Sequence, residues 1–353
     1  MNIPFEPGMF RIKVIRAVHF QERVSMIARL FARRCLAGVV LGGAAFLAQA
    51  QEAVINAVHF TPAQNGYAKS FLKYVDLVNT RGKGVVRIQV RGGPEVMPVM
   101  QLGEAQKNGL IDMLDAPPGF YLNLIPEGEV FSATRKKPWE LRENGGFALI
   151  DRIFGEKGNA KILAHVDAGT GFHVFTVDEP ARTADGGVDW SKLKVRSAPL
   201  YRDFLDALGA TPVVQPPGET YTSLERGLVN ANAYTVLGYS SFGWDKFTKH
   251  RIDPSFLQAD VLITMNKRKW DSLSPQAQKI LQDTAIEYER ASYDANLAGT
   301  KAEGEAMIGK GMKVVTLSGE ARKRYEDAAS RVTWERMNKR DPSNVPALKA
   351  KFD

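Results

Sequence analysis

The chain has 353 residues, of which 24% are charged and 44% hydrophobic. These ordinary globular proportions exclude an extended disordered protein, a collagen-like fibre and a polytopic membrane protein. The formal net charge of +8 is concentrated at the front, where residues 1–50 hold seven basic and two acidic groups, so that residues 51–353 carry only +3. Such a small, scattered excess lacks the basic face that nucleic-acid binding requires, so no nucleic-acid partner is expected.

Residues 1–50 have the features of an upstream segment followed by a secretory signal. Three arginines between positions 29 and 34 precede an apolar run that ends at the small-x-small sequence Ala48-Gln49-Ala50. The run is shorter than the roughly 20 residues that cross a bilayer, so we predict export and cleavage near Ala50. Whether the natural start is Met1 or Met26 stays open.

The first half of the exported chain alternates between strand-like and helix-like segments. Composition and apolar spacing predict, in order, a strand at 54–60, a helix at 67–78, a strand at 85–90, a helix at about 97–108 and a strand at 110–114. Alternation of this kind is typical of a largely parallel sheet covered by helices.

The pattern resumes after residue 160. It predicts strands at 161–166, 172–177, 193–196, 211–215 and 313–317, and helices at 201–208, 220–227 and 320–337. Ser274-Pro275 supplies an N-cap and a first-turn proline to a helix with no obvious stop before Gly299 or Gly304. A helix of that length exceeds one small lobe, so we expect it to brace two.

The sequence therefore predicts an α/β protein with two lobes. We expect residues 51–170 to form the first lobe, completed by part of 255–300. Residues 171–254 are expected to form the second lobe, completed by part of 300–353. The length of the chain agrees with this division, because domains commonly have about 100–200 residues.

The sequence lacks the familiar motifs of catalysis and metal binding. The only cysteine lies in the predicted signal, which excludes disulfides, thiolate metal sites and cysteine nucleophiles from the exported chain. The sequence around Ser240 has the wrong spacing for a nucleophile elbow, no phosphate-binding loop is present, and the four histidines beyond residue 51 lack metal-ligand spacing. We expect neither a catalytic group nor a cofactor.

Arg196 is the residue best placed to bind a ligand. It ends a short apolar strand directly before Ser197-Ala198-Pro199. Ligands of open α/β sheets bind at the carboxyl ends of strands. A guanidinium there can pair with a carboxylate through two parallel hydrogen bonds. From these residues alone, a surface arginine in a salt bridge is the alternative, and normally the favoured one.

Several segments resemble one known family in order along the chain. Leu193–Arg196, Leu208–Val213 and Glu219–Asn230 are similar to the core of the solute-binding proteins of TRAP (tripartite ATP-independent periplasmic) transporters, and Gln101–Met113 resembles their first-lobe segment. The similarity covers nearly all of 51–340.

This resemblance implies a periplasmic-binding-protein-like fold whose two lobes close over a small organic acid, with a long helix across both. It also implies a periplasmic location and docking of the loaded protein on membrane permease subunits. Arg196 matches the family's carboxylate-pairing arginine.

Two positions depart from the family pattern. Many members carry a second arginine near Phe172 and an asparagine at the position of Tyr234. Replacement of polar contacts by aromatic rings favours a monocarboxylate with an apolar or aromatic end, because an unpaired polar ligand group would lose its hydration there. Tyr121, Glu95 and Trp244 follow strands or turns and are further candidates for ligand contact, with core packing as the alternative for the aromatic residues.

Two other functions remain open at this point. The same pocket would serve a ligand-sensing protein for a membrane receptor. An exported hydrolase or lyase with an acid–base pair brought together only by folding is the alternative from the enzyme class. The transporter receptor, which performs no reaction, is the function that the resemblance favours.

Overall fold

The structure, a computed structural model, describes residues 52–353. The predicted signal, its cleavage near Ala50 and the alternative start at Met26 lie outside these residues. Within the described part, no helix is both long enough and apolar enough to cross a membrane.

The first sheet has five strands in the order β2-β1-β3-β10-β4. They are β1 (Ala53–His59), β2 (Val86–Gly92), β3 (Met113–Ala116), β4 (Ala160–His165) and β10 (Leu262–Asn266). β1 pairs in parallel with β2 and β3, whereas β10 runs antiparallel to β3 and β4.

The second sheet has six strands in the order β11-β9-β5-β8-β6-β7. They are β5 (Gly171–Thr176), β6 (Lys194–Ser197), β7 (Thr211–Val214), β8 (Ala231–Thr235), β9 (His250–Gln258) and β11 (Lys313–Thr316). β6 is parallel to β7 and β8, and β11 is parallel to β9, but β5 is antiparallel to both β8 and β9.

The expectation of largely parallel sheets is therefore wrong. The chain passes from the first sheet to the second between β4 and β5, and returns between β9 and β10. β5 and β10, the strands that arrive by these crossovers, run against their neighbours on both sides. Simple β–α–β alternation along the sequence contains no sign of such crossovers.

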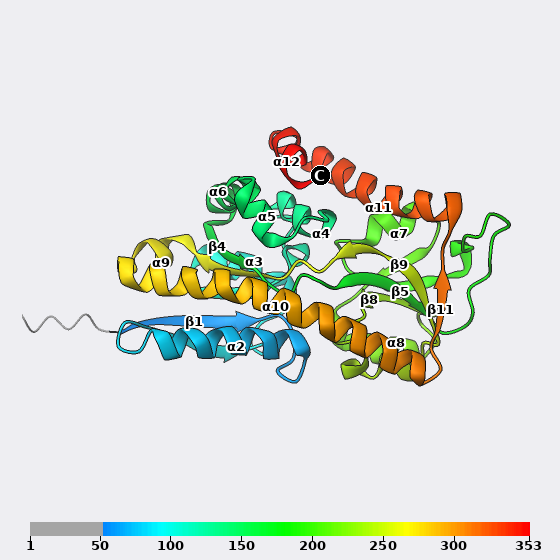
Figure 1. Ribbon diagram of the computed structural model, residues 1–353, viewed down its shortest axis with the longest axis horizontal. Helices are drawn as coiled ribbons and strands as arrows, with labels where there is room; N and C mark the ends of the chain where they lie inside the picture. Colours follow the sequence, from blue (N-terminus) through cyan, green and yellow to red (C-terminus); the bar gives the residue numbers. More distant parts are fainter. Residues whose placement is uncertain (1–51) are drawn as a thin grey trace, which may run out of the picture. The chain divides into compact units, whose positions relative to one another are not determined.

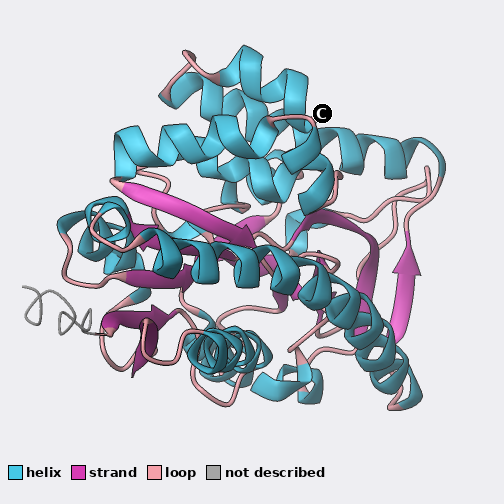
Figure 2. Ribbon diagram, turned by 60° about the vertical axis from the view of Figure 1, so that its left-hand side comes forward, coloured by secondary structure: helices cyan, strands magenta, loops and turns pink. Residues whose placement is uncertain are grey.

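Helices flank the strands on both sides (Figure 2). The α-helices are α2 (Gly66–Arg81), α3 (Leu102–Asn108), α4 (Val130–Ala133), α5 (Pro138–Glu143), α6 (Gly146–Gly158), α7 (Arg202–Ala207), α8 (Thr220–Glu225), α9 (Lys267–Asp271), α10 (Pro275–Gly309), α11 (Gly319–Arg340) and α12 (Val345–Phe352). Short 3-10 helices are η1 (Val99–Gln101), η2 (Pro118–Phe120), η3 (Pro126–Glu129), η4 (Trp190–Lys192), η5 (Pro217–Glu219), η6 (Ser240–Phe242) and η7 (Trp244–Lys246).

Helix α10 braces the two sheets, as the sequence predicts (Figure 1). Its 35 residues begin after Ser274, whose side chain accepts a hydrogen bond from the backbone N–H of Ala277. The helix packs on α2 and β4 of the first lobe. Near its other end, Glu303 accepts hydrogen bonds from the backbone N–H groups of Gly238 (2.7 Å) and Ser240 (2.8 Å), which follow β8.

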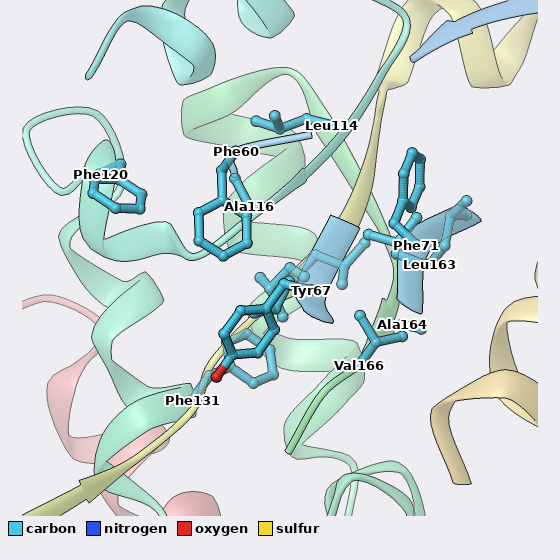
Figure 3. Close-up of a cluster of buried hydrophobic side chains, with 14 of the residues drawn as sticks. Phe60, Tyr67, Phe71, Leu114, Ala116, Phe120, Phe131, Leu163, Ala164 and Val166 are labelled. Atoms are coloured by element: carbon cyan, nitrogen blue, oxygen red, sulfur yellow. The ribbon is translucent and has the colours of Figure 1, made fainter. Parts of the chain in front are cut away.

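Aromatic side chains of the first lobe extend the hydrophobic core toward the junction of the sheets. Figure 3 shows Phe60, at the end of β1, between Phe120 and Tyr67. The ring of Phe60 lies 5.9 Å from that of Phe120 and 5.7 Å from that of Tyr67. All three side chains are buried. Together they form the apolar side of the first lobe that faces the second lobe.

Candidate functional site

A narrow cavity lies at the junction of the two lobes. Its lining comes from the first lobe, from the second lobe and from the returning crossover, and consists of Phe60, Tyr67, Pro117, Gly119 and Phe120, then Phe172, Arg196, Ala198, Leu200, Tyr201, Pro217 and Tyr234, and finally Ala259, Asp260 and Val261. Its volume of about 40 Å³ is far below the roughly 300–1,000 Å³ of typical ligand pockets. A small organic ligand therefore fits only when the walls move apart.

Arg196 reaches the cavity from β6, where it pairs in register with Val213 and Asn232. Its Nε and Nη2 donate to the carbonyl oxygen of Gln215 at 3.1 and 2.8 Å. Its Nη1 donates to Tyr201 Oη at 3.1 Å and to the Ala233 carbonyl at 3.3 Å. A guanidinium has five N–H groups on three nitrogens, and bonds from all three nitrogens fix its plane.

The positive charge of Arg196 has no counter-ion in the described part of the chain. The side chain is 1% exposed, and none of the ion pairs among residues 52–353 includes it. The guanidinium carbon instead lies 5.9 Å from the centre of the Tyr234 ring. A buried charge without a partner is costly, so this arrangement favours an anionic group in the cavity.

Aromatic rings form most of the remaining wall. Phe172, at the start of β5, packs against Tyr201 with 5.3 Å between ring centres and against Phe256 with 6.0 Å. Phe60 and Phe120 face the cavity from the first lobe. The site thus combines one fixed cation with apolar walls, an arrangement suited to a small acid with an apolar body.

Asp260 is the second ionisable residue on the cavity wall. It lies between β9 and β10 and is 1% exposed, and neither carboxyl oxygen has a hydrogen-bond partner in the described structure. Burial raises the pKa of Asp260 to about 8, the residue's own backbone N–H opposes this effect in part, and the nearby carboxylate of Glu129 adds a smaller upward effect. The sequence analysis missed this residue, because Gln258 and Asp260 alternate with apolar residues as they would in a strand with one face in solvent.

Three of the predicted site residues come together. Arg196, Phe172 and Tyr234 line the same cavity. The hydroxyl group of Tyr234 is buried without a hydrogen-bond partner in the described part of the chain. Ligand contact by these residues stays a prediction.

The other three predicted residues do not belong to the cavity wall. Tyr121 follows η2 and packs against Gly103 of α3. Glu95 is exposed in the turn after β2, where its Oε1 accepts from the backbone N–H of Gly93 at 2.7 Å. Trp244 is fully buried behind the wall, with 4.9 Å between its ring centre and that of Tyr234. In this conformation Trp244 supports Tyr234 instead of facing the cavity.

The described residues contain no group of three or more His, Cys, Asp or Glu side chains arranged to hold a metal ion. The chemistry that the cavity offers is binding: a fixed guanidinium, one buried carboxyl group and aromatic walls.

Comparisons with known proteins agree with this geometry. Residues 57–340 match the model of the bacterial extracellular solute-binding protein family 7. The ectoine-binding periplasmic protein TeaA of Halomonas elongata is 23% identical over 283 residues, which cover 78% of this chain and 75% of TeaA. The 2,3-diketo-L-gulonate-binding periplasmic protein YiaO of Escherichia coli is 28% identical over 299 residues, which cover 79% of this chain and 85% of YiaO.

The fold is also found in solved structures. The crystal structure of a TRAP periplasmic solute-binding protein from Desulfovibrio salexigens with bound orotic acid matches with a TM-score of 0.75 and 18% identity, covering 85% of this chain and 97% of that one. This match confirms the predicted two-lobe α/β fold. The chain belongs to family 7 of the bacterial extracellular solute-binding proteins, the family of TRAP solute receptors that its sequence resembles.

Proposed function

We propose that this protein is a periplasmic receptor that holds the carboxylate of a small organic acid on Arg196 and delivers the acid to the membrane permease subunits of a TRAP transporter. The observation that carries the proposal is the buried guanidinium of Arg196, which faces the cavity without a counter-ion in the described chain. The relatives TeaA and YiaO, which bind ectoine and 2,3-diketo-L-gulonate, support the ligand class.

The geometry refines how the arginine would meet the acid. All three nitrogens of Arg196 donate hydrogen bonds, to Gln215, Tyr201 and Ala233. A carboxylate therefore meets the charge of a guanidinium whose N–H groups are partly engaged. A two-bond pairing with the carboxylate requires it to replace one of the carbonyl acceptors. The Arg196 side chain is positioned before the ligand arrives, which lowers the ordering cost of binding.

Lobe closure would connect binding to transport. The cavity is almost filled by its own walls in this conformation, so ligand entry requires the lobes to separate. A ligand that contacts both lobes stabilises the closed state through its higher affinity for that state. We expect the closed, loaded form to be the one that the permease subunits recognise.

Titration calorimetry with Arg196 variants tests the proposal. Protein freed of retained ligand by unfolding and refolding is first screened by thermal unfolding against aliphatic, aromatic, keto, hydroxy, amino and sugar acids. Arg196→Met should weaken binding of the best acid by at least about 30-fold, equivalent to roughly 2 kcal/mol.

Arg196→Lys keeps the charge and tests whether the planar donor set is needed. Arg202→Met is the matched control, because Arg202 lies on nearby α7 with a 58% exposed side chain paired to Asp206. Unchanged binding by the folded Arg196→Met protein would refute the assignment of the site.

A further inference from the structure

Asp260 is a second ionisable side chain in the cavity wall, besides Arg196. Its carboxyl group is buried, lines the cavity, and has no donor to either oxygen in the described structure. Leaving a buried acceptor without a donor costs free energy, and a structure retains such a group where something else satisfies it. The missing donor is therefore expected from whatever occupies the cavity.

The rest of the lining does not supply that donor in the present arrangement: the Tyr234 hydroxyl is free, but it forms no hydrogen bond with Asp260 in the described structure. Arg196 lies on the same cavity wall but forms no ion pair with Asp260. The Tyr201 hydroxyl donates to Ala233, and the Tyr67 hydroxyl is 2.9 Å from Thr235 Oγ1. Both hydroxyl groups are thus engaged elsewhere.

Charge balance identifies the kind of donor. An acid bound to Arg196 balances the charge of that arginine, so Asp260 can ionise in this buried space only when the ligand also carries a positive charge. A cationic nitrogen on the ligand neutralises Asp260 and donates to its oxygens. The faces of Phe60, Phe120 and Tyr67 on the cavity wall also favour a cation.

We propose that the ligand of this receptor is a zwitterion, an amino or amidino carboxylic acid whose carboxylate lies on Arg196 and whose cationic N–H group lies on Asp260. This inference rests on the proposed function and narrows its ligand class from organic acids in general.

Binding of such a ligand is coupled to release of a proton. In this conformation burial raises the pKa of Asp260 to about 8, against the opposing effect of its own backbone N–H, and the carboxylate of Glu129 acts in the same direction as burial. Glu129 is itself paired with Arg336. A cationic donor favours the ionised form of Asp260 and lowers its pKa, so the protein loses a proton to the buffer at pH 7.

Two pairs of nearly isosteric acids test the proposal by calorimetry. L-Proline is compared with tetrahydrofuran-2-carboxylate, and piperidine-4-carboxylate with cyclohexanecarboxylate, since each pair differs in the cationic nitrogen. We expect the nitrogen-bearing member of at least one pair to bind at least tenfold more tightly. Titrations in buffers of different ionisation enthalpy should show release of a proton with that member.

Substitutions test whether Asp260 causes the preference for the nitrogen-bearing acid. Asp260→Asn keeps the shape of the side chain and should abolish both the tenfold preference and the proton release. Asp115→Asn is the matched control, because Asp115 is also buried with both oxygens unpartnered in the described chain but is not part of the cavity wall. The control should retain the preference.

The outcomes separate the two proposals. If the acids without nitrogen bind as well in both pairs, or if no member binds to protein that responds to other acids, the zwitterion inference is wrong. Provided that Arg196→Met still weakens acid binding at least about 30-fold, the receptor function would stand. A preference that survives Asp260→Asn would also overturn the inference.

Discussion

Arg196 and Tyr201 share a single acceptor, the carbonyl oxygen of Ala233. The Tyr201 hydroxyl donates to this oxygen at 2.9 Å and accepts from Arg196 Nη1 at 3.1 Å, while the same Nη1 lies 3.3 Å from the carbonyl. Arg196 is on β6, Ala233 is on the adjacent strand β8, and Tyr201 immediately precedes α7. The triangle fixes the guanidinium relative to the sheet.

Tyr201→Phe tests this positioning role. The variant keeps the ring against Phe172 but removes one acceptor of the arginine. We expect acid affinity to fall roughly three- to tenfold and the free energy of unfolding to fall by about 1 kcal/mol, the usual worth of one hydrogen bond. Calorimetry and urea unfolding measure the two effects.

Tyr325→Phe is the control for loss of a buried phenol oxygen. Tyr325 is buried in the core of the second lobe, and its hydroxyl has no partner in the described structure. Its removal should leave affinity unchanged and stability equal or slightly higher. Equal effects of the two substitutions would show that the triangle does not position Arg196.

Arg336 connects the two lobes through a buried ion pair. From α11 its Nη2 donates to Glu129 Oε2 of η3 at 2.6 Å and also to the carbonyl oxygen of Leu200, which lies just after β6. Glu129 is fully buried. Arg336→Met should lower the free energy of unfolding by about 3 kcal/mol, because it leaves the buried carboxylate of Glu129 with only the longer ion pair to Arg340, 3.5 Å from Nη1 to Oε1. Urea unfolding measures the loss.

Two further variants test whether the loss of stability comes from breaking a buried ion pair or from removing any arginine of this helix. Arg324→Met removes an arginine of the same helix whose side chain is 62% exposed and paired with Asp185, so it should cost less than about 1 kcal/mol. Glu129→Gln combined with Arg336→Met should recover part of the loss by removing the stranded acid. A double variant no more stable than Arg336→Met would contradict the buried-pair explanation.

The sequence predicted a helix or strand well where residues within that element, or directly beside it, determine where it begins and ends. Ser274-Pro275 identified the start of α10, and the glycine after Leu208 identified the end of α7. Strand β9 was missed because it contains Pro254 and several polar residues and continues through a crossover into the other lobe. Its pairing with β5 and β11 depends on residues far away in the sequence.

The sequence predicted part of the site, as it predicted part of the fold. Arg196 follows from its place at the end of a strand and from the family resemblance. Asp260 has no local pattern that distinguishes it from a surface acid, because its isolation results from the packing of both lobes around the crossover. Glu95 was chosen for its place after a turn, and its side chain instead bonds the backbone of that turn.

Gly103, in the segment that resembles the family's first lobe, has a steric role behind the cavity wall. A Cβ atom at this position would lie 2.4 Å from Tyr121 Cβ. Gly103→Ala should therefore displace Tyr121 and its neighbour Phe120, and destabilise the protein by about 1–3 kcal/mol. Gly66→Ala is the control, because no atom lies within 4 Å of the carbon it adds on α2, and it should be neutral or stabilising. Thermal unfolding measures the effect of both substitutions.

His165 makes stability depend on acid pH. Burial lowers the pKa of His165 to about 4, its Nε2 donates to the Ala259 carbonyl, which partly offsets that effect, and Arg142 lowers the pKa further. The unfolded chain, with a histidine pKa of about 6.5, therefore binds more protons than the folded one between these values. The contribution is fully present above about pH 6.5 and is lost as the pH falls to about 4, a total of roughly 3 kcal/mol.

His165→Gln removes this proton uptake and keeps a donor for Ala259. Buried carboxyl groups such as Asp167, whose pKa burial raises to about 6, change stability in the opposite direction over part of the same range. The readout is therefore the difference between the two proteins in urea unfolding from pH 4 to 8. We expect the variant to lose less stability than the parent chain between pH 6.5 and 4, because only the parent must exclude a proton from a buried ring. Parallel curves would show that folding does not lower the pKa of His165.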